Sequence, residues 1–195
     1  MELLLDGQAA EAPEGIGPTL GDLLAALHEK IGAEGKAVTT ITLDGEELMP
    51  AGEEQALALP AADFGKVELL TAPAREWGLH GLGEAASALG QMADEFRDIA
   101  DLLRTGDRAQ SVERFQNAIA VYGQLVGAMV NAASFAGVPA PEGFQECVAA
   151  VTDAMKEMTP ALQAEDSVEA ADLAEYELAE RLEELGKMVK SMAED

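Results

Sequence analysis

The stretch FQNAIAVYGQLVGAMVNAA, residues 115–133, shows the pattern that governs most of this chain. Its apolar side chains recur every three or four residues, as they do on one face of an α-helix. The same spacing returns 59 residues later in AEYELAERLEELGKMVKSM, residues 174–192. The paired positions are Phe115 and Ala174, Ile119 and Leu178, Val126 and Leu185, Met129 and Met188, Val130 and Val189, and Ala133 and Met192.

The segments that precede these two stretches correspond in the same way. Leu89, Met92, Phe96, Ile99 and Leu103 map at the same offset onto Val148, Val151, Met155, Met158 and Leu162. Four helices with short connections are therefore expected, and successive helices should be antiparallel neighbours. The correspondence fits a duplicated helical hairpin, and it also fits the regular spacing that any helical bundle requires.

Capping signals place the ends of these helices. Asp107 with Gln110, and Asp166 with Glu169, resemble capping boxes, and Pro141 suits the first turn of a helix. We expect helices over residues 82–104 and 108–135, from Pro141 to beyond Leu162, and from Asp166 to about Met192.

The first 72 residues have a different pattern. Residues 1–6, 8–13, 37–43 and 64–72 read as strands, with turns at Asp6-Gly7 and Asp44-Gly45. A helix over residues 20–31, capped by Thr19, carries one apolar stripe. The order strand, strand, helix, strand, strand is that of a β-grasp module.

The opening strand, the Asp6-Gly7 turn, the helix entry Thr19-Leu20-x-x-Leu23-Leu24 and the closing strand at 65–69 resemble the β-grasp sulfur carriers of thiamin and molybdopterin synthesis. Those carriers end in a free Gly-Gly, whereas here the chain continues through Ala72-Pro73-Ala74-Arg75. The resemblance therefore implies the fold rather than sulfur transfer. The expected class is α+β, with a ubiquitin-like β-grasp domain at 1–72, a linker at 73–81 and an antiparallel four-helix bundle at 82–195.

Charge restricts the partners. The chain has 37 acidic and 12 basic residues and a net charge of −25, which repels nucleic-acid phosphates and anionic lipids. A protein partner with a basic surface is expected, and the excess acid also fits simple solubility or a salty habitat. A single cysteine, no apolar run of about 20 residues and no basic segment at the start favour the cytoplasm.

Catalytic motifs are sparse. The two histidines, His28 and His80, lie outside the expected bundle helices, and no Glu-x-x-His of a di-iron site occurs. Cys147 falls on an inward helix position, as a buried structural thiol would. No phosphate loop or nucleophile elbow is present. We expect no enzyme activity, no catalytic residue, no metal site and no cofactor.

The expected function is a protein–protein interaction module, an adaptor or assembly factor, and the helical faces also allow self-association into a homo-oligomer. Trp77 is read either as an anchor between domains or as an exposed contact for a partner. The acidic face of the last helix is the other candidate binding surface, formed by Glu169, Asp172, Tyr176, Glu180 and Glu183. The alternative is a regulator that binds a small ligand or metal ion near Trp77 and His80.

Overall fold

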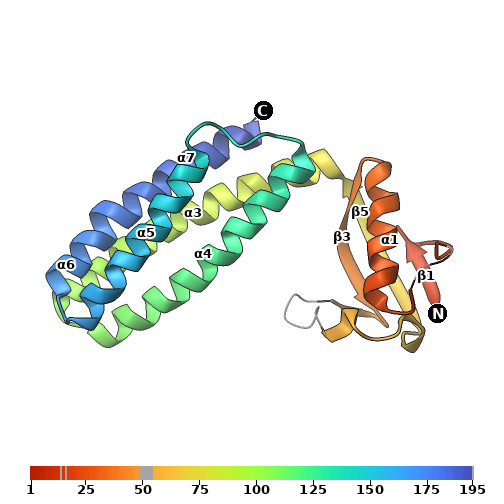
Figure 1. Cartoon of the computed structure of the whole chain (residues 1–195), viewed down its shortest axis with the longest axis horizontal. Helices are drawn as coiled ribbons and strands as arrows, with labels where there is room; N and C mark the ends of the chain where they lie inside the picture. Colours follow the sequence, from red (N-terminus) through yellow and green to blue (C-terminus); the bar gives the residue numbers. More distant parts are fainter. Residues whose placement is uncertain (14, 16, 49–54, 195) are drawn as a thin grey trace. The chain divides into compact units, whose positions relative to one another are not determined.

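The computed structural model describes residues 1–13, 15, 17–48 and 55–194, and it is of the α+β class. The chain divides into two compact units, Met1–Trp77 and Gly78–Asp195, each with its own hydrophobic core. The first unit holds the sheet and the second holds the long helices (Figure 1).

The first unit is built on a five-stranded mixed sheet of order β2-β1-β5-β3-β4. β1 runs parallel to β5, and the other neighbouring strands are antiparallel. The strands are β1 (Glu2–Leu5), β2 (Gln8–Ala9), β3 (Lys36–Leu43), β4 (Glu46–Glu47) and β5 (Lys66–Pro73). The return strand expected over 8–13 is only two residues long, and the sequence pattern did not reveal β4.

Both predicted Asp-Gly turns are confirmed. Asp6 and Gly7 have φ of 51° and 77°, and Asp44 and Gly45 have φ of 50° and 92°. Positive φ at both central residues is what a tight two-residue hairpin turn needs. Asp6 also ties its turn to β5, because its carboxylate accepts hydrogen bonds from the Thr71 amide at 2.8 Å and the Thr71 hydroxyl at 2.7 Å.

Helix α1 (Leu20–Ala33) covers one face of this sheet (Figure 1). Thr19 and Asp22 form the capping box: each side chain accepts a hydrogen bond from the other residue's amide, both at 3.1 Å. The stripe expected from the sequence is buried, namely Leu20, Leu23, Leu24, Leu27 and Ile31. It packs with Leu3, Val67 and Leu69 of the sheet, and a short 3₁₀ turn, η1 (Ala61–Asp63), precedes β5.

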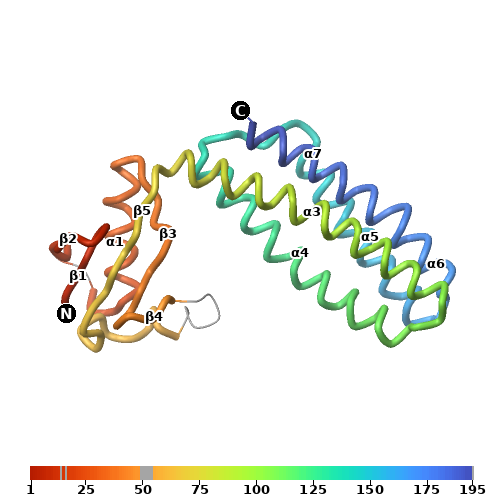
Figure 2. Tube along the Cα trace, turned by 180° about the vertical axis from the view of Figure 1, so that it is seen from behind, coloured from red at the N-terminus to blue at the C-terminus, as the bar shows by residue number. Residues whose placement is uncertain are grey.

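The second unit consists of long helices that run side by side (Figure 2). They are α3 (Ala74–Thr105), α4 (Arg108–Ala136), α5 (Phe144–Gln163), and a last helix made of α6 (Ser167–Asp172), η2 (Leu173–Ala179) and α7 (Glu180–Glu194). The segment η2 is π-helical, so the last helix is continuous but locally underwound, with a wider turn than the α-helix on either side.

Two helix starts differ from expectation. α3 begins at Ala74, directly after β5, so the segment 73–81 that was expected as a linker is helical from Ala74. No proline interrupts residues 74–81, and Gly78 and Gly81 are tolerated because the first lies against α4. α5 begins at Phe144 after Gly143, which has a φ of 82°, so Pro141 precedes the helix and does not open it. The Asp107 and Asp166 caps are present, each accepting from the amide three residues on.

The core of the helical unit contains few aromatic residues. Phe96 of α3 meets Phe115 of α4 edge to face, with ring centroids 6.2 Å apart. Most of the remaining buried side chains are Leu, Ala, Met and Val from all the long helices. Small side chains bury little area each, so this core depends on close helix approach.

Gly78 shows how close that approach is. A Cβ added at Gly78 would lie 2.4 Å from the Ala132 carbonyl oxygen and 2.4 Å from the Ala136 amide nitrogen, which are both backbone atoms of α4. We expect Gly78→Ala to lower the free energy of unfolding by about 1–3 kcal/mol through overpacking. Urea unfolding followed by circular dichroism measures this change.

Gly83→Ala is the matched control, because a Cβ there meets no atom within 4 Å. It should raise stability by roughly 0.5–1 kcal/mol, since alanine is the better helix former. Equal effects of the two substitutions would contradict the close α3–α4 contact.

Candidate functional site

An apolar groove runs between α4 and α5. It consists of three adjoining hollows of about 250, 450 and 310 Å³. The first two share Ile119 and Thr159, and the last two share Val126 and Val148, so the hollows form one continuous surface, which we call the α4–α5 groove. Its buried lining residues are Phe115, Tyr122 and Met129 of α4, Phe144, Met155 and Leu162 of α5, and Met192 of α7.

The groove is unlike the rest of this acidic chain. None of the described residues that line its three hollows is Asp or Glu, and its charged lining residues are Arg108 and Lys156. Residues 115–136 of α4 contain no charged side chain at all. Large apolar side chains on a solvent-exposed face, without charges among them, are the usual mark of an interaction surface.

Comparison with the last helix shows how much of the apolar stripe of α4 is not covered by a neighbouring helix. Ile119 is 40% exposed and Val130 is 58% exposed. Leu178 and Val189, which occupy the same places in the repeated spacing, are both 0% exposed. The apolar spacing over residues 115–133 was therefore predicted correctly. The structure leaves several of these side chains exposed instead of buried. The sequence signal for exposure was the absence of charge on any side of residues 115–136.

Two polar contacts hold the walls of the groove in place. The Tyr122 hydroxyl of α4 donates to the Val148 carbonyl of α5 at 3.1 Å, at the middle of the groove. Burial raises the pKa of Tyr122 to about 12, so the hydroxyl keeps its proton. At one end, the Arg108 guanidinium donates to the Leu162 carbonyl at 2.6 Å and to Glu165 at 2.8 Å. The separation of α4 and α5 is thus fixed at two points.

The predicted acidic face of the last helix is only partly gathered into one place. Glu169, Asp172 and Tyr176 line a shallow hollow of about 560 Å³ with the exposed Val168. Glu180 and Glu183 lie farther along and do not line it. Trp77 lies on α3 and is 39% exposed.

Arginines of α3 bind several of these carboxylates. Arg104 pairs with Asp172 at 3.5 Å and also with Glu175 of η2. Arg97 pairs with Glu183, and this hydrogen bond lowers the pKa of the Glu183 carboxyl and raises that of Arg97. Asp172 and Glu183 therefore serve first to join α3 to the last helix, which leaves Glu169, Tyr176 and Glu180 more available to a partner.

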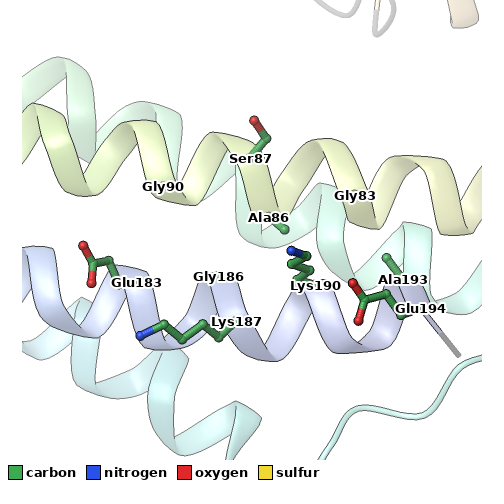
Figure 3. A pocket seen from close by; sticks show the side chains of 10 residues that line it. All are labelled: Gly83, Ala86, Ser87, Gly90, Glu183, Gly186, Lys187, Lys190, Ala193 and Glu194. Carbon is green, nitrogen blue, oxygen red and sulfur yellow. The ribbon is translucent and has the colours of Figure 1, made fainter.

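A separate hollow of about 510 Å³ lies between α3 and α7. Figure 3 shows Lys190 directed toward α3, while Ser87 points away from α7. Gly83, Gly90 and Gly186 line it, so it exists largely because side chains are missing there. Two lysines and two glutamates border it, and these balanced charges select no ligand of either sign.

The groups with catalytic or ligating chemistry lie apart. Cys147 is buried, and burial raises the pKa of its thiol, which disfavours the reactive thiolate. The Sγ atom lies 3.7 Å from the Arg181 carbonyl. His28 contacts the Leu24 carbonyl through Nδ1 at 2.8 Å on α1. Among the described residues, no three His, Cys, Asp or Glu side chains are grouped so that they could hold a metal ion.

Helix α4 also meets the length and hydropathy criteria for a membrane span, alone among helices of the described residues. Core helices meet the same criteria, and α4 contributes Phe115, Tyr122 and Met129 to the core. This finding is weak and does not locate the protein.

A family model described as "Domain of unknown function (DUF8042)" matches residues 81–188, which is more than half of the chain. These residues include nearly all of the helical unit and the whole α4–α5 groove apart from Met192. No curated protein matches the chain, and no solved structure matches it.

The Arg97–Glu183 pair gives a testable pH dependence. A carboxyl whose pKa is lowered in the folded state stabilises the protein above its unfolded pKa, and this contribution is lost as the pH falls through the folded value. The free energy of unfolding of the wild type should therefore exceed that of Glu183→Gln at pH 7. The difference should shrink as the pH is lowered below 4.5, the ordinary value for Glu.

Glu180→Gln, at an exposed position of the same helix, is the control. Its stability relative to the wild type should change much less with pH. Parallel curves for the two variants between pH 7 and pH 3 would show that the pair does not couple α3 to α7.

Proposed function

The chain belongs to the DUF8042 family, and we propose that it is a non-enzymatic protein–protein interaction module, acting as an adaptor or assembly factor in the cytoplasm. The observation that carries the proposal is the α4–α5 groove. The chain has a net charge of −25, yet this helix face is apolar, uncharged and exposed to water. Such exposure is unfavourable, and a partner that covers the face would remove that cost. Because the groove lies in the part of the chain that the family model matches, we propose that binding is a property of the family.

We further propose that the first unit is a β-grasp domain. Its order β2-β1-β5-β3-β4, the parallel β1–β5 pair and α1 across one face support this assignment. β5 passes directly into α3 at Ala74, where a sulfur carrier would have its free Gly-Gly. This continuation supports a β-grasp fold used for positioning or binding, without sulfur transfer.

The second unit is proposed to be an antiparallel four-helix bundle. Helices α3, α4, α5 and the continuous α6–η2–α7 share one buried core, which supports this description. In such a bundle α4 would be the helix with the least covered outer surface. A partner helix placed against it would complete the packing that α7 already has.

The partner is proposed to be a protein with a basic surface. The negative field of the whole chain would attract such a partner and speed its association. Nucleic acid and anionic membranes are disfavoured by the same field. Glu169, Tyr176 and Glu180 supply exposed polar groups for a second contact, beside the apolar one.

The test is capture of partners from the source lysate by the tagged full-length protein, washed at low and at high salt. We expect a partner recovered in near-stoichiometric amount at low salt and in smaller amount at high salt, because salt screens the exposed charge pairs but does not weaken the apolar contact. A protein that emerges without any partner at both salt concentrations would contradict the proposal. Glu29→Gln/Glu34→Gln/Glu46→Gln, which removes three exposed charges from the first unit, should retain the partner and so serves as the control.

A further inference from the structure

We propose that the outer face of α4 binds the same face of a second copy of this chain, with the two α4 helices antiparallel. The surface consists of six exposed residues, which we call the amide face: Asn117, Ala120, Gln124, Gly127, Asn131 and Ser134. None of the six lines the α4–α5 groove. This surface is therefore separate from the one that carries the proposed function, and either assignment can fail without the other.

The amide face lies on the side of α4 that points away from the core. Gln124 follows the buried Tyr122 by two residues, which is about 200° around the helix. Asn117 and Asn131 are seven residues before and after Gln124, so the three amides lie within about 20° of one line along the helix. A small residue follows each amide three positions later on the same side, namely Ala120, Gly127 and Ser134.

Composition distinguishes this face from the rest of the surface. The sequence contains only two asparagines, Asn117 and Asn131, and both lie here. Residues 115–136 carry no charge, whereas α3, α5 and the last helix each carry several acids. Within the described chain, no hydrogen bond occupies the side-chain amide of Asn117, Gln124 or Asn131. Because a carboxamide both donates and accepts, the amides of another uncharged helix can satisfy these groups.

The amide face is complementary to itself when one copy is reversed. Amides and small residues occupy it at heptad spacing, as a and d positions do in a coiled coil. We place the two-fold axis of an antiparallel pair between residues 125 and 126. Asn117 then meets Ser134 of the second copy, Gln124 meets Gly127, and Asn131 meets Ala120.

This register satisfies both shape and hydrogen bonding. Each long amide packs against a small residue, which lets the two helices approach closely. Amides from the two copies alternate every three or four residues along the contact, so that each lies near an amide of the other helix. Polar amides at such positions are known to fix the register of helix pairs. A partner with small residues where α4 has amides, and amides where α4 has small residues, is supplied by α4 itself.

A parallel pair fits less well. It would place amide opposite amide and small residue opposite small residue, which leaves gaps at the small positions. It would also place Glu113, which continues the same heptad spacing, opposite Glu113 of the second copy. The antiparallel register aligns the two uncharged segments 115–136 with each other. It carries Glu113 past Ala136, the last residue of the second copy's α4.

Length and charge determine the strength of the dimer. The uncharged segment has 22 residues, which is about 33 Å of helix. A contact made by one helix of each copy falls at the low end of specific interfaces, so a weak dimer is expected. The two net charges of −25 repel each other, and salt screens this repulsion. The dimer should therefore strengthen with salt, whereas recovery of a basic partner should fall.

Sedimentation equilibrium of the full-length protein measures the association. We expect a monomer–dimer equilibrium in which the dimer fraction rises with protein concentration, and rises further between about 50 and 500 mM salt. A protein that stays monomeric up to about 500 μM at both salt concentrations would overturn the proposal.

Gly127→Glu tests the contact itself. An added Cβ at Gly127 meets no atom within 4 Å, so the monomer should keep its fold, as circular dichroism would show. In the dimer the new side chain would bring bulk and an unpaired charge against Gln124 of the second copy, and it should weaken dimerisation about tenfold or more. Gly83→Glu on α3 is the control, because it adds the same charge at an equally open glycine outside the amide face. Equal dimerisation of the two variants would show that the amide face is not the interface.

Disulfide cross-linking tests the orientation. In a Cys147→Ala background, Asn117→Cys and Ser134→Cys each place one thiol at positions that meet in the antiparallel pair. The two positions are 17 residues apart in the chain, about 25 Å along the helix. We expect a covalent dimer only when the two variants are mixed and oxidised. Cross-linking of each variant with itself would show a parallel pair, and a dimer that no combination cross-links would show a different interface; either result would overturn the proposal.

Discussion

Unequal burial of two helices with the same apolar spacing is the feature on which the rest of this account depends. The last helix places Leu178, Leu185 and Val189 in the interior of its unit. Helix α4 has an equivalent stripe, but only its inner edge, with Phe115 and Met129, reaches the core. Apolar area in water is unfavourable at about 25 cal/mol per Å². Folding leaves part of the apolar surface of α4 exposed to water. Burying that surface in a complex would therefore contribute favourable free energy to binding.

Ion pairs between the helices help to determine which helices pack together, and the apolar surface of α4 stays exposed. Arginines of α3 join α3 to the last helix through Asp172, Glu175 and Glu183. On the α4 side, Arg114 of α4 pairs with Glu95 and Asp98 of α3. These pairs are partly exposed and each contributes little stability, but together they set which helices stay adjacent. The strong net negative charge opposes association of like chains. Under the proposed function, this leaves the apolar face open to a different partner.

Local sequence rules anticipated much of the fold. Capping residues Thr19, Asp107 and Asp166 begin their helices as expected, and the Asp-Gly turns have the backbone that tight hairpins need. These features depend on contacts within a few residues, which sequence shows directly. The α+β class followed from them, whereas the segment 73–81 was expected as a linker and is helical from Ala74. Gly78 is there to permit contact with Ala132 and Ala136, which are distant in sequence.

The candidate site was harder to foresee, because periodicity shows which face of a helix is apolar but not whether a neighbour covers it. Ile119 and Val130 were expected on the apolar face of their helix, and they line an open groove. Conversely, Asp172 and Glu183 were expected on a free acidic face, and arginines from α3 bind them. Both outcomes depend on the spacing between helices, which results from the packing of the whole unit.

Cysteine reactivity at paired positions tests the central claim most directly. In a Cys147→Ala background, Val130→Cys and Val189→Cys place one thiol at equivalent positions of the repeated spacing, and labelling of the native monomer with a thiol reagent compares them. The account predicts that the thiol at position 130 reacts within about tenfold of the rate in denaturant, because this position is exposed. The thiol at position 189 should react only through opening of the structure, orders of magnitude more slowly. Equal protection of both thiols in the monomer would show that α4 is already covered, and the account would then be wrong.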